Sequence, residues 1–334
     1  MIKVGVVRGG PSSEYDVSIK TGGNILSHLR GDKLKDRYKA VDIFIDKDGV
    51  WHQNGLPTSM EQISNSVNVI FNALHGTYGE DGKIQQLLDQ WKVPYTGSSA
   101  FASALGFNKV LSKERFGHLN IKTPKYILFP VYQKDIDGPL NKYVDIKART
   151  VIGKISPPWI VKPLTGGSSV GMHLCKTFDE LRETFREIVP TGLSIFVEEF
   201  IKGKEATVGV IDNFRGQGRY VLPPIEIRVP KSSSFFDYKA KYSGKSEEIC
   251  PGNFTNEEKE ELSKLASIIH EGLGLSHYSR SDFIIDTKGD IYALEVNTLP
   301  GLTDESLFPK SLEAVGSNTA EFIDHILKLA LKIK

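Results

Sequence analysis

Polar side chains alternate with apolar ones along two short runs near the end of the chain. Arg280 and Asp282 lie in the first run, and Glu295 and Asn297 lie in the second. The polar segment between the runs contains Gly289, a pattern typical of a β-hairpin. If the loop is symmetric, Asp282 lies opposite Glu295. Arg280 then lies opposite Asn297, and because side chains alternate along a strand, the four are predicted to share one face.

This predicted face carries the kind of oxygen ligands that magnesium prefers. The carboxylates of Asp282 and Glu295 and the amide oxygen of Asn297 are hard ligands, and phosphate oxygens can complete the shell of Mg²⁺. The alternative is a solvated hairpin face with a surface ion pair. The opposite face is expected to fill a core with four side chains, Phe283, Ile285, Tyr292 and Leu294.

The same residues resemble the metal-binding hairpin of a known family. The runs Arg280-Ser-Asp282 and Glu295-Val-Asn297-Thr-Leu-Pro-Gly301 are similar to those of ATP-grasp ligases, most closely the D-alanine:D-alanine ligase family. The resemblance implies ATP as a substrate and Mg²⁺ as the cofactor, with two ions expected and Mn²⁺ as a substitute. Five separated motifs in the family's order extend the resemblance over nearly the whole chain.

Length and composition are those of an ordinary globular protein. The 334 residues suffice for two or three domains with substantial cores. The chain is 25% charged with a net charge of +1, which indicates no nucleic-acid partner. No apolar run approaches the roughly 20 residues that span a bilayer, so we expect no membrane partner and a cytoplasmic location. Cys175 and Cys250 lack metal-type spacing and fit a reducing compartment.

The first third of the chain has the pattern of a small parallel α/β domain. Strands are predicted at 2–7, 40–45 and 67–74, and helical patterns alternate with them. A glycine-rich turn after the first strand leads into a helix that begins near Glu14. In the first turn of a helix, this carboxylate either complements the helix dipole or attracts an ammonium group.

Two segments of this region match motifs of the same family. Glu14 stands at the position of the glutamate that helps to hold the ammonium group of the first D-alanine. His75 begins the second motif, His-Gly-Thr-Tyr-Gly-Glu-Asp-Gly, directly after the third predicted strand. Open α/β sheets bind ligands at the carboxyl ends of their strands, so His75 is predicted to contact the substrate.

Lys109 and Lys162 are the candidate phosphate-binding lysines of the central third. Lys109 leads into a helix and could equally be a solvated surface residue. Lys162 ends an apolar strand-like run, where a lysine needs an anionic partner. The glycine- and serine-rich turn around Ser168 offers N–H and hydroxyl donors for phosphate, although Ser168 could be only a turn residue. The resemblance assigns both lysines and Ser168 to the ATP phosphates.

The last third supplies the remaining candidates. Glu198 and Glu205 flank a short turn, which is either an exposed acidic turn or, by the resemblance, the linker that holds adenine and ribose. The long aromatic segment 232–252 resembles the lid of the family, with Lys241 and Tyr242 at its active positions. In the family, the tyrosine of the lid is hydrogen-bonded to the loop serine and the N-terminal glutamate, which correspond to Ser168 and Glu14.

The predicted fold is of the α/β and α+β class, in a three-domain ATP-grasp architecture. Residues 1–96 are expected to form an N-terminal domain with a parallel sheet, residues 97–199 the central domain, and residues 200–334 the C-terminal domain. The resemblance places the nucleotide between the central and C-terminal domains. It also implies a homodimer.

The implied activity is the ligation of two D-alanine molecules for peptidoglycan precursors. ATP converts the first carboxylate into an acyl phosphate, which the amine of the second D-alanine then attacks. Arg280 and the Gly301 N–H are expected to stabilise the oxyanion, and Ser306 and the Leu307 N–H to hold the second carboxylate. The alternatives are a D-alanine:D-lactate or D-alanine:D-serine ligase, another ATP-grasp carboxylate–amine ligase, and a nucleotide-binding module without chemistry.

Overall fold

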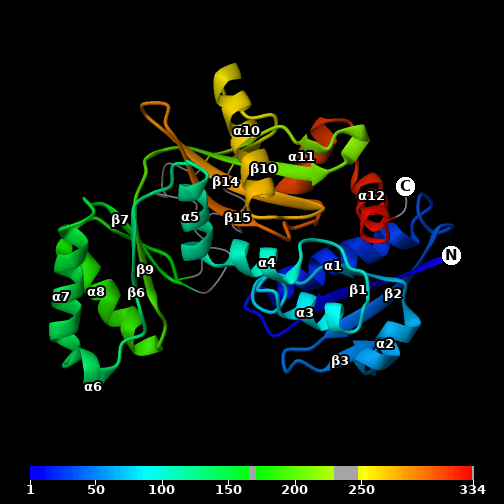
Figure 1. Ribbon diagram of the computed structural model, residues 1–334, viewed down its shortest axis with the longest axis horizontal. Coiled ribbons are helices and arrows are strands. Elements are labelled where there is room, and N and C mark those ends of the chain that lie inside the picture. Colours follow the sequence, from blue (N-terminus) through cyan, green and yellow to red (C-terminus); the bar gives the residue numbers. More distant parts are fainter. Residues whose placement is uncertain (165–170, 229–246, 333–334) are drawn as a thin grey trace.

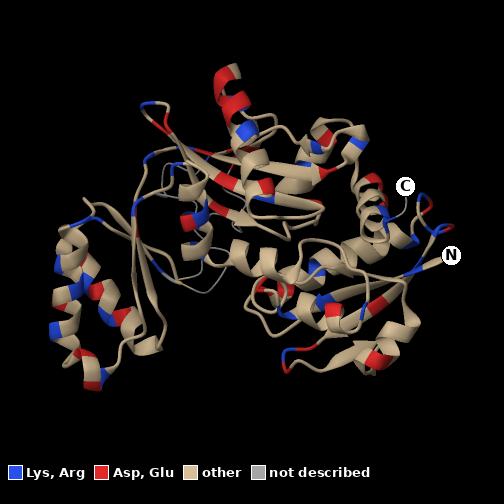
Figure 2. Ribbon diagram, in the orientation of Figure 1, with Lys and Arg blue, Asp and Glu red and all other residues tan. Residues whose placement is uncertain are grey.

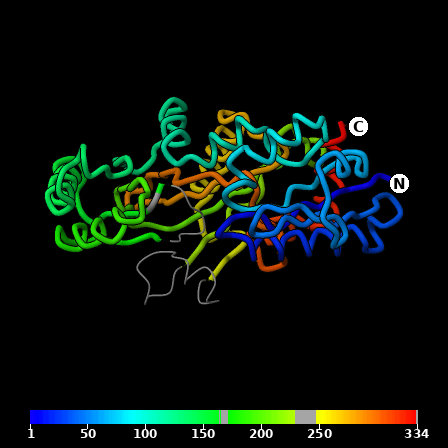
Figure 3. The backbone as a smooth tube through the Cα atoms, turned by 90° about the horizontal axis from the view of Figure 1, so that it is seen from below, coloured from blue at the N-terminus to red at the C-terminus, as the bar shows by residue number. Residues whose placement is uncertain are grey.

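The computed structural model describes residues 1–164, 171–228 and 247–332. The strands of the described residues form three sheets. The N-terminal and C-terminal sheets lie together at one end of an elongated molecule, and the central sheet stands at the other end (Figure 1). Both ends of the chain lie at the same end of the molecule, as the tube view also shows (Figure 3).

The N-terminal sheet has the strand order β4-β3-β2-β1-β5. β1 pairs in parallel with both β2 and β5, which confirms the three predicted strands, whereas β3 and β4 add an antiparallel edge. The sheet is therefore mixed rather than purely parallel. Its strands are β1 (Ile2–Gly9), β2 (Tyr38–Ile45), β3 (Trp51–Gln53), β4 (Leu56–Pro57) and β5 (Val69–Asn72), and its helices are α1 (Tyr15–Arg30), α2 (Met60–Ser66) and α3 (Lys83–Gln90).

Two short helices connect this sheet with the central one. Residues 97–109 were expected to lead into one helix, but the chain forms α4 (Ala100–Phe107) and α5 (Lys109–His118) with a break at Asn108. The Asn108 side chain accepts hydrogen bonds from the backbone N–H groups of Val110 and Leu111, at 3.0 and 3.2 Å. Asparagine favours this N-cap position because its side chain satisfies N–H groups that have no partner within the helix. Lys109 is consequently the first residue of α5.

The central sheet is antiparallel, with the order β6-β9-β7-β8. Helices α7 and α8 cover its outer face and bury a separate apolar core with it (Figure 1). The elements are β6 (Tyr126–Phe129), α6 (Lys134–Asp137), α7 (Leu140–Ile152), β7 (Trp159–Pro163), β8 (His173–Cys175), α8 (Phe178–Ile188), η1 (Val189–Thr191) and β9 (Ile195–Glu199).

The C-terminal sheet has the order β13-β12-β10-β14-β15, and β11 also pairs with β10. Helix α10 packs on one face through Leu262, Leu265 and Ile269, the predicted apolar stripe. The opposite face carries the candidate site. The elements are β10 (Gly203–Asp212), η2 (Phe214–Gly216), β11 (Arg219–Val221), β12 (Ile225–Arg228), β13 (Glu247–Ile249), α10 (Asn256–Gly272), β14 (Tyr278–Asp286) and β15 (Ile291–Asn297).

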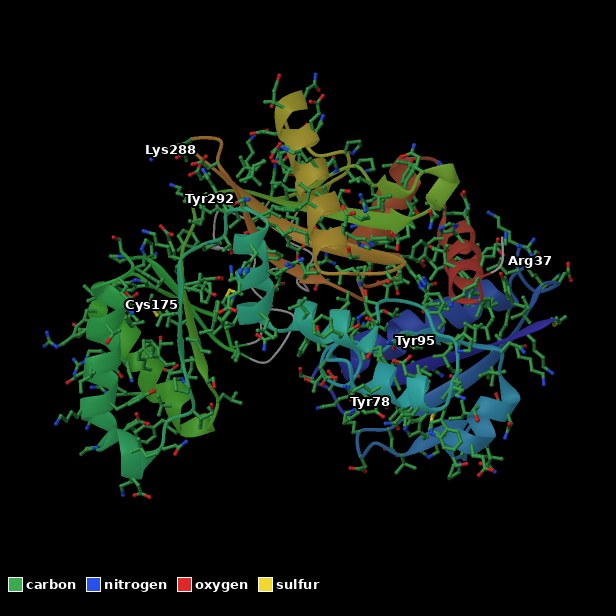
Figure 4. All side chains as sticks on the ribbon, viewed as in Figure 1. Arg37, Tyr78, Tyr95, Cys175, Lys288 and Tyr292 are labelled. Carbon is green, nitrogen blue, oxygen red and sulfur yellow. The ribbon has the colours of Figure 1, made fainter. Side chains whose placement is uncertain are left out.

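The last two helices, α11 (Leu307–Ala314) and α12 (Thr319–Ala330), join the two sheets at this end. Phe322 and Ile326 of α12 belong to the same buried cluster as Val4 of β1 and Ile25 of α1. Arg37, labelled beside α12 in Figure 4, forms an ion pair with a carboxylate of that helix. Among the described residues, no helix is both long and apolar enough to cross a membrane.

Candidate active site

The β14–β15 hairpin has the predicted pairing at its polar end. Asp282 lies opposite Glu295, and Arg280 lies opposite Asn297. On the other side of β14, Thr207 of β10 lies opposite Asp282. Three neighbouring strands therefore present polar groups on one face of the C-terminal sheet.

The pairing near the loop differs from the prediction. Ile284 lies opposite Tyr292, Phe283 lies opposite Ala293, and the register shifts between this part and Asp282. The shift leaves Leu294 as an extra residue, a β-bulge. Ala293 therefore fills the core with Phe283, and the prediction that Tyr292 and Leu294 would do so is wrong. Tyr292 lies instead on the Asp282 face, near the loop end of the hairpin (Figure 4).

Asp282 is the centre of the polar network on this face. Arg280 donates to both carboxylate oxygens, at 3.0 Å each. Asn297 donates its amide N–H to Oδ2 at 3.1 Å, and Thr207 donates its hydroxyl to Oδ1. Although burial opposes it, the Asp282 carboxylate raises the pKa of Arg280 above its ordinary value. The guanidinium is thus charged and held in one orientation.

The donor set on this face fits a magnesium ion. Two carboxylates and an amide supply oxygen ligands, and the Asn297 N–H bond to Asp282 leaves the Asn297 carbonyl oxygen for another partner. The described residues contain no group of three or more His, Cys, Asp or Glu side chains with the spacing of a metal site. A metal here would therefore need Asn297 and the oxygens of a bound phosphate as ligands.

The two predicted lysines lie at the junction between the central and C-terminal sheets. Lys109, at the start of α5, lies 3.9 Å from a Glu295 oxygen. Lys162, in β7, donates to Glu198 Oε1 at 2.7 Å, which supplies the anionic partner expected for it. A third lysine that the sequence did not single out, Lys113, lies 3.2 Å from Glu198 Oε2.

Glu198 is buried between these two lysines. Burial would raise the pKa of its carboxyl group, but Lys113 and Lys162 outweigh burial and lower it. Its Oε2 atom has no well-aligned hydrogen bond within the described residues, so it keeps the capacity to accept one. Glu205 pairs with Ile284, and Thr207, two residues later in β10, pairs with Asp282. Because residues two apart on a strand share a face, Glu205 lies on the same face of the sheet as Asp282. Both glutamates flank the turn 200–202, as predicted.

The N-terminal domain contributes carboxylates and a neutral histidine. Glu80 is buried and accepts the Gly76 N–H at 2.9 Å. A Cβ atom at Gly76 would lie 2.6 Å from Glu14 Oε2, so both carboxylates converge on this residue. Burial, reinforced by the charge of Glu14, raises the pKa of Glu80 to about 8. Burial lowers the pKa of His75 to about 4, and its Nε2 lies 2.9 Å from Thr21 Oγ1.

Gly301, Ser306 and Leu307 lie close together after the hairpin. A Cβ atom at Gly301 would lie 2.9 Å from Ser306 Oγ. Ser306 is the N-cap of α11 but makes no side-chain cap, and instead its Oγ lies 2.7 Å from Thr303 Oγ1. Leu307 is the first residue of that helix. The N-terminus of a helix suits a carboxylate, which is the group that Ser306 and the Leu307 N–H are predicted to hold.

Three predicted residues, Ser168, Lys241 and Tyr242, lie outside the described residues. The described candidates come together from all three sheets around the polar face of the hairpin. Glu80 lies near enough to Arg280 for the charge of each to affect the pKa of the other, and Glu14 acts on Glu80 in the same way. The lysines and Glu198 mark the other side, next to Glu295.

Family models match most of this chain. Residues 121–328 match the D-ala D-ala ligase C-terminus, and residues 3–66 and 55–98 match the D-ala D-ala ligase N-terminus. The chain belongs to the D-alanine--D-alanine ligase family. Within this family, it is 37% identical to the D-alanine--D-alanine ligase of Geotalea uraniireducens over 99% of this chain and 96% of that relative.

Solved structures of the family share the fold. The D-alanine--D-alanine ligase of Bacillus anthracis complexed with ATP is 29% identical, with a TM-score of 0.78 over 100% of this chain and 98% of that one. The VanG D-Ala:D-Ser ligase of Enterococcus faecalis is 25% identical, with a TM-score of 0.83 over 98% of this chain and 99% of that one. The mixed α/β fold with three sheets is thus the fold of this ligase family.

Two buried charged residues beside the predicted site, Glu80 and Lys113, were not predicted from the sequence. Glu80 stood within a quoted motif but received no role, although its acidic position between two glycines of a ligand-binding loop was a usable signal. Lys113 stands one helical turn after Lys109, where a second lysine is usually part of a solvated face. Its partner, Glu198, lies in β9 of the central sheet, far away in the sequence. The sequence near Lys113 therefore gave no sign that this lysine is buried.

Proposed function

We propose that this chain ligates two D-alanine molecules to D-alanyl-D-alanine, consuming ATP and releasing ADP and phosphate, for peptidoglycan precursor synthesis. The observation that carries the proposal is the match to D-alanine--D-alanine ligases over the whole chain. The hairpin register, which brings Arg280, Asp282 and Glu295 together, supplies the chemical means.

The first step activates one carboxylate. The ammonium group of the first D-alanine binds beside Glu14, with the neutral His75 ring close by. An oxygen of its carboxylate attacks the γ-phosphorus of ATP, and the bond to the β-phosphate oxygen breaks, giving an acyl phosphate and ADP. Lys109 and Lys162 hold the phosphates, while Glu198 and Glu205 bind the adenosine part between the central and C-terminal sheets.

The polar face of the hairpin stabilises the negative charge of this step. Mg²⁺ held by Asp282, Glu295 and Asn297 would neutralise charge on the phosphate oxygens. The protein's own contribution is the orientation of these ligands: Asp282 is held by Arg280, by Asn297 and by the hydroxyl of Thr207. Such fixed groups need little reorganisation when charge develops.

The second step forms the peptide bond. The amine of the second D-alanine, in its neutral form, attacks the acyl carbon. The C–O bond to phosphate breaks as the tetrahedral adduct collapses, and the nitrogen releases one proton, which the departing phosphate can accept. Arg280 and the Gly301 N–H stabilise the oxyanion of that adduct. The carboxylate of the second D-alanine binds at the start of α11, against Ser306 and the Leu307 N–H.

The lid residues complete the proposal. Tyr242, with Ser168 and Glu14, is proposed to close over the site, and Lys241 is proposed to contact the phosphates. Closure would exclude the water that otherwise hydrolyses an acyl phosphate. We further propose domains at 1–96, 97–199 and 200–334, a cytoplasmic homodimer, and Mg²⁺ or Mn²⁺ as the metal.

A second candidate concerns the second substrate, because a D-Ala:D-Ser ligase is among the structural relatives. The chain is more similar in sequence to D-alanine--D-alanine ligases, with 37% identity, so D-alanyl-D-alanine is the expected product. Tyr242→Phe is expected to raise the ratio of ester to amide when D-lactate competes with D-alanine, most clearly at low pH where the amine is protonated. An unchanged ratio would show that Tyr242 does not select between D-alanine and D-lactate as the second substrate.

The direct test measures ATP-dependent phosphate release with D-alanine and identifies the product by chromatography. Parallel reactions contain D-serine or D-lactate as the competing second substrate. We expect D-alanyl-D-alanine in stoichiometric ratio to phosphate, and little product with either competitor. Phosphate release without dipeptide, or a preference for D-serine or D-lactate, would contradict the proposal.

A further inference from the structure

A fully buried lysine lies at the junction of the central and C-terminal sheets. The side chain of Lys113, in α5, has no exposed surface. Taking an ammonium group out of water is costly unless it gains charged and polar partners. Lys113 has two such partners: its Nζ donates to Thr123 Oγ1 at 2.6 Å and lies 3.2 Å from Glu198 Oε2.

Each of these partners continues into a different part of the nucleotide site. Glu198 accepts a second contact from Lys162 of β7 at 2.7 Å. Thr123 donates its hydroxyl to the carbonyl oxygen of Ala293 at 2.9 Å, in the strand that carries Glu295. A continuous set of polar contacts therefore runs from the central sheet, through Lys113, to the metal-ligand hairpin.

Helix α5 is placed to make both connections. Lys109 and Lys113 are four residues apart and so lie on the same side of the helix. Lys109 lies 3.9 Å from Glu295, and Lys113 lies beside Glu198. In Figures 1 and 2, α5 passes between the central sheet and the hairpin and carries charged residues there. One helix thus sets the separation between the carboxylates of the two sheets.

Both lysines of this cluster contact the single carboxylate of Glu198. Lys113 and Lys162 together carry two positive charges, and Glu198 carries one negative charge. Lys113 contacts one oxygen of Glu198 and Lys162 contacts the other, so the two ammonium groups together fix the orientation of the carboxylate. Removing Lys113 would leave Glu198 with Lys162 alone, and the carboxylate could then turn toward Lys162.

We propose that Lys113 is a positioning residue of the nucleotide site, which holds Glu198 between two ammonium groups and thereby fixes where Lys162 presents its charge to ATP. This inference rests on the proposed function for the identity of the nucleotide. Lys113 itself touches no phosphate in this scheme. Its effect is therefore transmitted through Glu198, and that dependence can be measured.

The test compares Lys113→Met and Lys113→Arg with a matched control, Lys154→Met, which removes an exposed lysine of the same region. The dissociation constant of a non-hydrolysable ATP analogue with Mg²⁺ is measured by calorimetry, and KM for D-alanine by phosphate release. We expect Lys113→Met to weaken analogue binding about tenfold and to change KM for D-alanine by less than about twofold. Lys113→Arg should recover most of the binding, and the control should match the wild type.

A double-mutant cycle separates positioning from a general structural role. If Lys113 acts through Glu198, Lys113→Met should add little to the binding loss of Glu198→Gln. Unchanged analogue binding in Lys113→Met, equal losses for nucleotide and D-alanine, or additive losses in the double mutant would each overturn the proposal.

A variant that keeps the charge covers the case in which Lys113→Met does not fold. Thr123→Val removes the hydroxyl between Lys113 and Ala293 at nearly constant volume, and it should weaken analogue binding by about threefold. Wild-type binding in a folded Thr123→Val protein would then overturn the proposal. Analogue binding does not depend on which amino acids are joined, so failure of the ligase assay and failure of this inference remain distinguishable.

Discussion

The two ends of the proposed site differ in the sign of the charged groups that meet there. At the amino-acid end, Glu14 and Glu80 converge on Gly76 and repel one another strongly enough to help raise the pKa of Glu80 to about 8. At the nucleotide end, Lys113 and Lys162 share one buried carboxylate, that of Glu198. Two carboxyl groups therefore meet at one end, and two ammonium groups meet at the other.

This difference matches the charges of the two ligands. An ammonium group relieves the repulsion between two carboxylates, and phosphate relieves the repulsion between two lysines. In the hairpin between the ends, Arg280 and Asp282 have opposite charges and pair with each other. We infer that like charges held close together mark where substrate groups of the opposite charge bind, and that the Arg280–Asp282 pair keeps the protein's own groups in place.

The largest effect is expected at the hairpin, which serves both ends. Glu295→Ala should lower kcat by about 10³-fold or more, since a lost carboxylate ligand leaves phosphate charge unneutralised. The fold should be retained, as shown by an unchanged melting temperature. Glu260→Ala, an exposed change on α10, is the matched control. Activity of Glu295→Ala close to that of the wild type would remove the hairpin from the chemistry.

A smaller loss is expected for Arg280. Arg280→Ala should lower kcat by roughly 10²-fold with a smaller effect on KM, because the guanidinium stabilises charge that develops only in the transition state. Steady-state kinetics with saturating ATP would measure both constants, with Arg280→Lys as the charge-preserving comparison. A change confined to KM would instead mean that Arg280 binds the substrate, like the charged groups at the two ends of the site.

The amino-acid end can be tested without substrate through the stability of Glu80→Gln. The pKa of Glu80 is raised from 4.5 to about 8 in the folded chain, so the folded state binds this proton more tightly than the unfolded state. Stability should therefore fall as pH rises from about 4.5 to about 8, and the loss should be complete above that range. Glu80→Gln should remove this contribution.

Melting temperatures of the wild type and Glu80→Gln at several pH values check this prediction. We expect the melting temperature of the wild type to drop relative to the variant by a few degrees from about pH 6 to about pH 9. Glu14→Gln removes the charge that helps to raise this pKa, so the drop should move to lower pH and become smaller, though less so than in Glu80→Gln. Parallel pH profiles for wild type and Glu80→Gln would show that the carboxylates at this end are not strained by their proximity.

The smallest expected effect concerns how the amino-acid end is held against the hairpin exit. Asn24 of α1 donates to the Leu302 carbonyl oxygen at 2.7 Å. Asn24→Ala should lower the free energy of unfolding by about 1 kcal/mol, the typical contribution of one hydrogen bond. Urea unfolding monitors it, and Asn141→Ala, at an exposed position of α7, serves as control. A clear loss of kcat in the folded variant, beyond what this change in stability explains, would mean that the contact also positions Gly301.

The hairpin shows which parts of the site could be predicted from the sequence. The pairing of Asp282 with Glu295 followed from strand alternation and the length of the loop. The bulge at Leu294 did not, because a bulge depends on how the strand packs against the rest of the sheet. The same distinction applies to Lys113: its helix was predictable, but its burial depends on Glu198 and Thr123, which are brought to it only by the assembled sheets.

The strands of the N-terminal sheet show which parts of the fold could be predicted from the sequence. The long apolar runs of β1 and β2 were predicted, as buried parallel strands read clearly in a sequence. β3 and β4, with three and two residues, are too short to show a period and were missed. They form an edge far from the hairpin, so their omission did not affect the predicted site.

The buried cluster that α12 shares with β1 and α1 has a consequence for how the chain folds during synthesis. Val4 and Ile25 are made early, yet their partners Phe322 and Ile326 are made last. On the ribosome, the part of this cluster that α12 contributes is therefore missing until almost the entire chain has emerged. The Glu14 end of the site consequently acquires its final packing only after the hairpin and both lysine-bearing elements have been synthesised, so a truncated chain would not present a finished amino-acid pocket.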